Sequence, residues 1–452
     1  MTSAVATPAV RGAARGFDAL HLVLVGVLLS YVWRVQDLVP GLAALKVPTI
    51  ATALAAAMLA LDRRVGPQLA RVRSHRLWQL VPVFAGIATV SVAFSIAFGI
   101  SADFLARSLL PSVALATVVP LTIFAIAHAE RFAAVQVAGA TLYCVVILAE
   151  FDAGTGRLAS LVYYDANDLG MLLACTLPLS AYFARHARRA ASRAAAVATL
   201  VLFVFAIART GSRGAFLGLI AAGVVLVVRR GPGTARRVAT VAAVVAVLAL
   251  GAGARYWGTI GTILHPTRDY NWSGGSDAGR MAIWARGAGY VADRPLTGVG
   301  LAAFPVAEGT LSRIAARQEY GRGVKWSAAH NSFVQVAAEL GVPGLLVFCA
   351  MLAVAFGTAR RLARDAAAAP RHAARRGSEL AHAHAAAVAA FVVSGSFLSQ
   401  AYAPYLYFML GMIIGLDASV RAELAASAAP APAARRIAAW RVRHAAPAPD
   451  GP

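Results

Sequence analysis

The feature that most constrains this chain is a series of apolar runs, each long enough to cross the hydrocarbon core of a membrane. A spanning helix needs roughly 17 to 25 mostly apolar residues, and twelve such runs can be placed in the 452 residues. They cover residues 17–36, 41–61, 77–99, 108–127, 132–151, 167–185, 194–210, 214–230, 238–257, 332–357, 379–398 and 402–419. Only 14% of the residues are charged, well below the roughly 25% of soluble domains. We therefore expect an all-α polytopic membrane protein with about twelve transmembrane helices.

The charge distribution predicts how the chain is oriented. The net charge of +22 could suggest nucleic acid, but the basic residues form short clusters between the apolar runs. Lys and Arg resist translocation and stay in cytoplasmic loops. With both termini in the cytoplasm, 27 of the 42 Lys and Arg residues lie inside and 15 outside, nine of the latter in one long segment that the rule does not govern. We expect a multi-pass protein with two cytoplasmic termini and no nucleic-acid partner.

Four parts follow from this orientation. Residues 1–253 should hold helices one to nine, and residues 254–331 a large extracytoplasmic loop that contains helices of its own. Residues 332–419 should hold the last three spans. The tail at residues 420–452, with its Ala-Pro repeats and basic residues, is expected to be cytoplasmic, partly disordered and in contact with membrane lipids.

Two arginines flank a tight outer turn between the seventh and eighth spans. Arg209 and Arg213 enclose Thr-Gly-Ser, and arginine so close to the hydrocarbon is costly unless it snorkels or faces a polar cavity. The guanidinium fork matches phosphate oxygens, and the free backbone N–H groups of a turn also favour an anion. The alternative is that both side chains only touch lipid headgroups.

The long loop should contain a helix that Ser276 or Asp277 caps and that Pro295 ends. At about 100° per residue, its apolar stripe comprises Met281, Trp284, Ala288 and Val291. Arg280 lies on the flank of this stripe, whereas Arg286 points nearly the opposite way. We therefore expect Arg280 to reach inward, unless it is solvated or paired with Asp277.

A histidine stands at the mouth of the tenth span, in the stretch WSAAHNSFVQVAAEL (326–340). Imidazole titrates near neutrality, which suits removal of a proton from a sugar hydroxyl. Asn331 or Ser332 should cap the helix, and its positive end favours the neutral, basic form of His330. A lone interfacial histidine is more often structural, so this role depends on whether His330 and the arginines share one cavity.

Further polar residues occur at helix ends or inside a span. Glu339 follows His330 by about two and a half turns and precedes GVPG (341–344), which should kink or break the helix. Glu339 could partner an arginine or orient a neighbour. Asp165 and Asp168 stand at the outer start of the sixth helix, where N-capping is the simplest role and a metal site is weakly supported. Cys144, Cys175 and Cys349 show no metal or disulfide spacing.

Four motifs in order resemble the bacterial O-antigen ligase and O-antigen polymerase superfamily. They are YYDANDLGMLLA, GSRGAFLGL, GRMAIWARGAGYVADRPLTGVGLAAF and AAHNSFVQVAAELGVPGLLVF, together spanning roughly residues 163–356. The resemblance implies a C-type membrane glycosyltransferase of the inner membrane with its active site facing the periplasm. It also implies a donor glycan on undecaprenyl diphosphate and an inverting transfer that needs no metal or cofactor.

The resemblance also implies site residues. It places Arg213 and Arg280 on the diphosphate and His330 on the acceptor hydroxyl. The other expected substrate-binding residues are Arg209, Asn331, Glu339, Asp168 and Trp284. A diphosphate leaving group requires cationic stabilisation, and carboxylates for a metal are scarce, so paired arginines are the natural clamp.

Three functions stay open at this point. The first is an O-antigen ligase, which transfers the glycan to lipid A–core. The second is the same chemistry with another acceptor, as in an O-antigen or exopolysaccharide polymerase or a protein O-glycosylation ligase. The third is a secondary transporter, but transporters usually bury ionisable residues near the midplane and show internal repeats. Here the ionisable side chains lie at helix ends, Glu339 apart, and no repeat is found, so the enzyme is favoured.

Overall fold

The computed structural model describes residues 18–38, 41, 45–149, 164–228, 233–265, 279–315, 327–367 and 372–428. These residues form helices and turns, with no strand among them. The elements are α2 (Ala19–Tyr31), α3 (Val35–Leu38), α4 (Val47–Leu61), α5 (Val65–Val72), α6 (Arg76–Ala93), α7 (Phe98–Phe104), the π-helix η2 (Leu105–Leu109), α8 (Leu110–Thr122), α9 (Ile126–Ala149), α10 (Ala166–His186), α11 (Ala190–Thr210), α12 (Arg213–Val228), α13 (Thr234–Gly251), α14 (Ala254–Gly261), α15 (Arg280–Asp293), α16 (Phe304–Thr310), α17 (Ser332–Asp365), α18 (His372–Gly395) and α19 (Pro404–Ala428).

Each of the twelve predicted apolar runs carries a helix. Six helical stretches are long and apolar enough to cross a membrane: Arg76–Ala93, Phe98–Thr122, Ile126–Ala149, Ala190–Thr210, Thr234–Gly251 and Ser332–Asp365. Three shorter helices, α2, α4 and α12, are also apolar. The fold is that of an all-helical, multi-pass membrane protein, while the number of twelve crossings stays a prediction.

The helix of the fourth run begins earlier in the structure than the apolar residues of the sequence predict. Helix starts at Phe98 rather than near residue 108 and continues through η2 into α8. Pro111 lies in the first turn of α8, directly after η2, where a missing N–H costs little. The chain therefore passes this proline without a break and leaves the helix only after Thr122.

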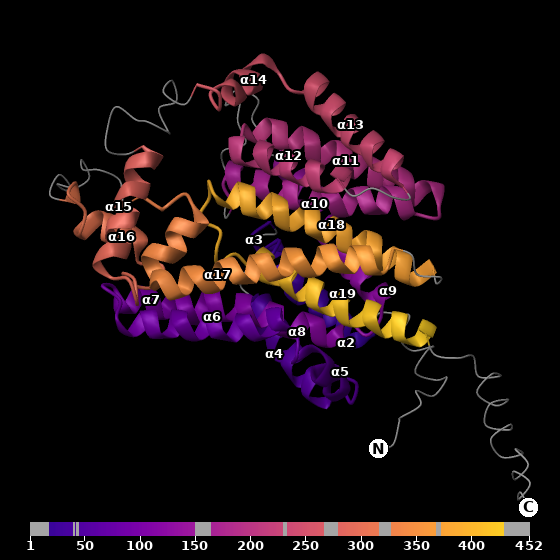
Figure 1. Cartoon of the computed structure of the whole chain (residues 1–452), viewed down its shortest axis with the longest axis horizontal. Helices are drawn as coiled ribbons and strands as arrows, with labels where there is room; N and C mark the ends of the chain where they lie inside the picture. The colour runs from indigo at the N-terminus through magenta and orange to yellow at the C-terminus, as the bar shows by residue number, and fades with distance from the viewer. Residues whose placement is uncertain are drawn as a thin grey trace, which may run out of the picture.

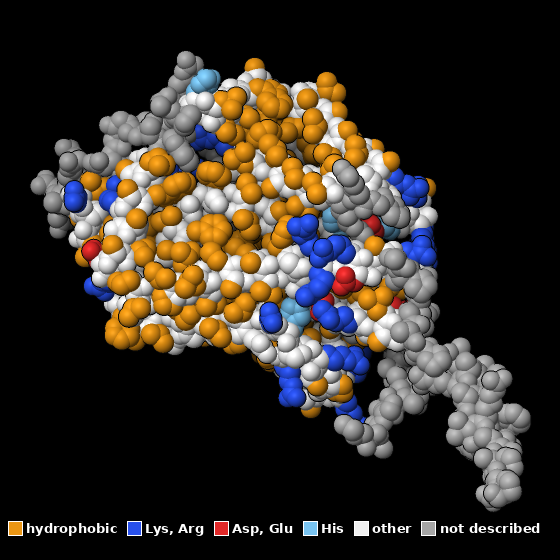
Figure 2. Space-filling view, viewed as in Figure 1, with side chains coloured by type: hydrophobic (Ala, Val, Ile, Leu, Met, Phe, Trp, Pro, Cys, Tyr) orange, Lys and Arg blue, Asp and Glu red, His pale blue; other side chains and the backbone are white. Residues whose placement is uncertain are grey.

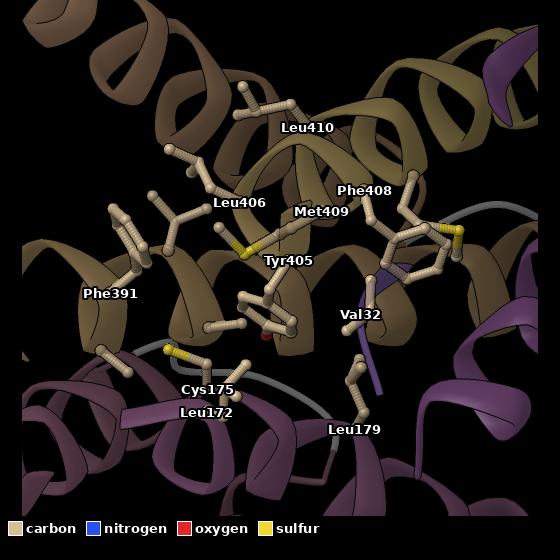
Figure 3. Packing of buried hydrophobic residues seen from close by; sticks show 14 of the residues in the cluster. Val32, Leu172, Cys175, Leu179, Phe391, Tyr405, Leu406, Phe408, Met409 and Leu410 are labelled. Carbon is tan, nitrogen blue, oxygen red and sulfur yellow. The ribbon is translucent and has the colours of Figure 1, made fainter. Parts of the chain in front are cut away.

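The core is centred on α18, which packs against α10, α12, α17 and α19 (Figure 1). Its buried side is rich in alanine, and small residues let membrane helices approach closely. Tyr405 of α19 fills the space between α18 and α10, where its ring points toward Cys175 and Leu172 (Figure 3). The long helices thus form one bundle whose ends carry the polar segments.

The molecular surface is consistent with a lipid environment. Apolar side chains cover most of the face shown in Figure 2, and basic side chains gather toward the ends of the bundle. Large apolar residues such as Leu61 and Leu250 are more than four-fifths exposed. Exposed apolar area on this scale is unusual for a soluble monomer, so these side chains are best placed against acyl chains.

The helix α17 is broken as the GVPG motif predicts. Gly341 has φ +70° and ψ −174° inside the helix, a conformation that residues with a Cβ rarely adopt. The break leaves the carbonyls of Ala338 and Glu339 without helical partners, and the segment after α15 supplies them. The N–H groups of Val299 and Gly300 donate to these two carbonyls at 2.8 and 3.1 Å. The broken helix thus fixes the segment that joins α15 to α16.

The predicted long loop holds α14, α15 and α16. In Figure 1, α15 and α16 lie at the left-hand end of the bundle beside the start of α17. The expected tail at residues 420–452 begins later than predicted, because α19 continues as helix to Ala428. The rest of that tail, and Trp326 before the histidine, lie outside the described residues.

Candidate functional site

Four of the predicted site residues line one cavity of about 610 Å³. Arg209 lies in the last turn of α11, Arg213 begins α12, Arg280 begins α15, and His330 stands two residues before α17. These segments are far apart in sequence, and the cavity is the place where their polar ends meet. His330 therefore shares a cavity with the arginines, which is the condition that its role as a base required.

The turn between α11 and α12 is held by its own side chains. Gly211 caps α11 with φ +62°, which glycine adopts without strain. Thr210 Oγ1 accepts the N–H of Ser212, and Ser212 Oγ accepts the N–H of Ala215. Arg213 donates from Nη1 to Thr262 Oγ1 at 2.8 Å, which connects this turn to the end of α14. The first turn of α12 is thus fixed with its arginine at the cavity wall.

The helix that carries Arg280 differs from the predicted one in its cap and its buried side. Its N-cap is Gly279, whereas the predicted caps Ser276 and Asp277 lie outside the described residues. The buried side chains are Ile283, Gly287 and Tyr290. The predicted apolar stripe is wrong at Met281 and Ala288, which are exposed, whereas Trp284 and Val291 are partly buried and pack against this core.

The preference for Arg280 over Arg286 nevertheless agrees with the geometry. Arg280 lies three residues before Ile283, on the buried side, and lines the cavity. Arg286 points elsewhere and binds the buried carboxylate of Glu308, with Nε 2.9 Å from Oε1. Tyr290 donates its hydroxyl to the same oxygen at 2.8 Å. Arg286 therefore joins α15 to α16, outside the cavity.

His330 occupies a turn that is fixed from both sides. Its backbone is left-handed, with φ +48°, a conformation that is uncommon for residues other than glycine and persists where neighbours impose it. Its N–H donates to Ser399 Oγ at 2.9 Å. The preceding carbonyl, of Ala329, accepts Nε1–H of Trp284 at 2.9 Å. The turn thus places the imidazole at the cavity wall between α15 and the segment after α18.

Asn331 and Trp284 support this turn rather than line the cavity. Asn331 caps α17 as predicted, since its side chain accepts the N–H groups of Phe333 and Val334. Trp284 packs against Phe397, a lining residue, with ring centroids 6.5 Å apart. Both residues, which were expected to bind substrate, therefore support lining residues of the cavity without lining it themselves.

Asp168 and Glu339 also lie outside the lining. Asp165 is the N-cap of α10 and accepts the N–H groups of Asn167 and Asp168, while the Asp168 carboxyl is bonded by the Gln400 side chain. Glu339 is buried and accepts the N–H of Phe304 at 3.2 Å. It contacts no arginine of the site and instead holds the start of α16.

Sequence reasoning missed the part of the lining that α14 and the start of α10 contribute. These residues are Arg255, Tyr256, Thr259 and Asn167. Arg255 was counted within the predicted run 238–257, but α13 ends at Gly251 and a new helix begins at Ala254. An arginine inside an apolar run was the signal that could have revealed it, because such a residue usually faces a polar cavity.

The chemistry of the lining suits an anion. Four arginines contribute to it, and none of the lining residues that the structure describes is an acid. Burial raises the pKa of Tyr256, so its phenol stays protonated. Its hydroxyl has no hydrogen-bond partner among the described residues. Guanidinium and phenol groups are hydrogen-bond donors, and several arginine forks match phosphate oxygens better than they match a metal ion.

Comparison with known proteins gives a family match over this part of the chain. The O-antigen ligase family model matches residues 198–349, which include Arg209, Arg213, Arg255, Arg280 and His330. A comparison with curated proteins gives no match. Members of the matched family are membrane enzymes of the glycosyltransferase kind, ligases and polymerases. The resemblance of the chain to the O-antigen ligase and polymerase superfamily is therefore confirmed, over the segment that builds most of the cavity.

Proposed function

We propose that the chain is an O-antigen ligase. It would transfer a glycan from undecaprenyl diphosphate to a sugar hydroxyl of lipid A–core, at the periplasmic face of a bacterial inner membrane. The main observation in support of the proposal is that four arginines and His330 line the same cavity. The family match covers the same residues, and the charge count predicts that this end of the bundle is extracytoplasmic.

The arginines would bind the diphosphate of the donor. The group leaves with about two negative charges, which must be stabilised as the sugar–oxygen bond breaks. Arg213 is fixed by Thr262, and Arg280 stands at the first position of α15, where the free N–H groups of a helix start also favour an anion. Arg209 and Arg255 complete the wall. Each bidentate contact is worth a few kcal/mol in the transition state.

His330 would act as the general base. It accepts the proton of the acceptor hydroxyl while the oxygen of that hydroxyl bonds to the anomeric carbon. The bond from that carbon to the diphosphate oxygen breaks, and undecaprenyl diphosphate leaves with the electron pair. Attack opposite the leaving group inverts the anomeric centre. The two hydrogen bonds that hold the His330 turn support this role, because a base must be positioned to within a few tenths of an ångström.

An apolar cavity of about 410 Å³ between α12 and α13 is suited to the lipid tail. Phe216 lines it and packs edge to face on Tyr256, a residue of the arginine cavity, with ring centroids 6.5 Å apart. An aromatic contact thus separates an apolar space from a cationic one. A polyprenyl diphosphate has the same division between tail and head.

Transfer in vitro tests the proposal. Purified protein is incubated with undecaprenyl-diphosphate-linked glycan and purified lipid A–core, and products are separated by gel and mass spectrometry. We expect glycan-bearing lipid A–core. Lengthening of the glycan in the absence of lipid A–core would show a polymerase, and transfer to a protein hydroxyl would show a protein ligase. Either result without lipid A–core product would overturn the ligase assignment.

Substitutions test the roles of the residues. His330→Ala should abolish transfer while donor binding persists, and His265→Ala, an exposed histidine near the end of α14, is the control. Arg213→Gln and Arg280→Gln should each weaken donor engagement at least tenfold, whereas Arg294→Gln, which lies outside the lining, should not. Turnover by His330→Ala at the rate of the control would remove this residue as the base.

A further inference from the structure

A second basic cavity, of about 910 Å³, lies at the end of the bundle opposite the candidate site. It is lined by the last turns of α17, by α19 and by the turn between α5 and α6. Along α17, Thr358 lies 26 residues after Ser332, or roughly 39 Å of helix. In Figure 2, basic side chains gather around acidic ones and a histidine at the right-hand end of the face. The proposed glycan transfer does not use this cavity.

We infer that this cavity binds the phosphate of an anionic phospholipid. Five arginines from four helices line it: Arg71 of α5, Arg76 of α6, Arg361 and Arg364 of α17, and Arg421 of α19. Asp417 is the one acid in the described lining. The excess of positive charge selects an anionic ligand over a zwitterionic one, and guanidinium groups prefer phosphate oxygens.

Four of these five arginines are available to a ligand. Within the described residues, Arg421 pairs with Asp417, whereas Arg71, Arg76, Arg361 and Arg364 are in no ion pair. Arginines that only follow the positive-inside rule need not converge. Arg188 and Arg189, exposed between α10 and α11, do not line this cavity. The convergence from separate helices is what distinguishes this cavity from such a solvated patch.

A buried acid and a histidine form the floor of the site. Asp417 is 4% exposed, and its Oδ2 accepts Nε of Arg421 at 2.7 Å and lies 3.7 Å from Nε2 of His75. This contact fixes Arg421 over the cavity. Burial lowers the pKa of His75, although the charge of Asp417 opposes this. Ser74 and Thr358 add hydroxyl groups to the lining.

The arrangement of polar and apolar residues matches a phospholipid in one leaflet. Arg361 and Arg364 lie toward the end of α17, and Val354 lies two turns nearer the middle of that helix. On α19, the partly exposed Ala418 likewise lies nearer the middle than Arg421. The phosphate would therefore contact the outer arginines, and the first part of an acyl chain would lie against the apolar inner wall. A free phosphate ion would use only the outer half.

Native mass spectrometry of the full-length protein tests the inference. The protein is released from nanodiscs that contain phosphatidylethanolamine with either phosphatidylglycerol or cardiolipin, and retained lipids are counted. We expect the anionic lipid to be enriched, and Arg361→Gln with Arg364→Gln to reduce that enrichment about tenfold or more. The control pair, Arg188→Gln with Arg189→Gln, should leave it unchanged.

Two additional measurements keep the inference testable. Arg361→Lys with Arg364→Lys retains the charge and should keep most of the enrichment. Comparison with this variant shows whether the glutamine variant loses lipid because it loses charge or because it folds poorly. Millimolar inorganic phosphate should not displace the retained lipid, because it lacks the acyl contact. Equal loss in the pocket and control variants, or complete displacement by phosphate, would overturn a phospholipid site.

Discussion

Replacing Trp284 by phenylalanine tests whether the His330 turn must be held rigidly. The indole Nε1–H donates to the carbonyl of Ala329, the residue before His330, at 2.9 Å. Phenylalanine removes this donor and keeps an aromatic ring against Phe397. Ala329 is 1% exposed, so its carbonyl would lose a partner that water cannot easily replace. The left-handed conformation at His330 would then lose one of its supports, while the bond from its N–H to Ser399 Oγ remains.

The expected size follows from the cost of one buried hydrogen bond. Leaving a buried acceptor unpaired costs about 1 to 3 kcal/mol. If about half of this cost disfavours the productive position of the imidazole, the rate falls by a factor of about 2 to 12, since 1.4 kcal/mol corresponds to a factor of ten. The arginines that we propose to bind the donor are untouched, so the apparent KM for the lipid-linked glycan should change little. A fall in kcat at constant KM is the signature of a lost positioning contact.

The assay is glycan transfer at saturating acceptor, with kcat and donor KM measured for Trp284→Phe and for Trp257→Phe. Trp257 lies on α14 next to the cavity residue Tyr256, and its Nε1 makes no hydrogen bond to the described residues. The control should therefore keep its kcat. A wild-type kcat in Trp284→Phe would refute the view that this hydrogen bond holds the base. A raised donor KM at unchanged kcat would instead show that Trp284 binds substrate directly.

Two further predictions concern α15. In Gly287→Ala, the new Cβ would lie 2.6 Å from Val334 Cγ1, and such overpacking costs about 1 to 3 kcal/mol, so the thermal midpoint of unfolding in detergent should fall. The control Gly289→Ala, with open space around the new Cβ, should leave the midpoint unchanged or raise it. Equal midpoints of the two variants would contradict the close packing of α15 on α17. Arg286→Gln removes the ion-pair partner of the buried Glu308 carboxylate and should lower the free energy of unfolding by about 3 to 5 kcal/mol. The thermal midpoint should therefore fall further in Arg286→Gln than in Arg280→Gln, which should chiefly lower glycan transfer. A larger fall of the midpoint in Arg280→Gln would show that the two arginines have exchanged roles.

Much of the fold could be predicted from the spacing of apolar residues. Each predicted run carries a helix, because a chain that must satisfy every backbone group in lipid has few alternatives. Local chemistry predicted the cap at Asn331 and the break at Gly341. These features depend on the residues within a few positions of each other, which a sequence displays directly.

The buried side of α15 could not be predicted from the positions of apolar residues in the sequence. Met281 is 49% exposed, whereas Gly287 is buried. Near a membrane, a large apolar side chain does not mark the side that faces protein, because lipid is also apolar. Small residues mark that side better, since they permit close approach. Arg255 was missed because the run 238–257 had the composition of one span, whereas the structure ends α13 at Gly251 and begins α14 at Ala254.

The broken helix explains why Arg280 and His330, 50 residues apart, keep a fixed relation. The break at Gly341 frees carbonyls that bind the segment after α15, and the Glu339 side chain binds the N–H of Phe304 at the start of α16. Both contacts hold the segment that joins α15 to α16, while Trp284 in the second turn of α15 holds the carbonyl before His330. The arginine and the histidine therefore share one support, and that support belongs to α17 itself. Glu339 thus contributes to the site without lining it, because these bonds hold Arg280 and His330 in one relative position.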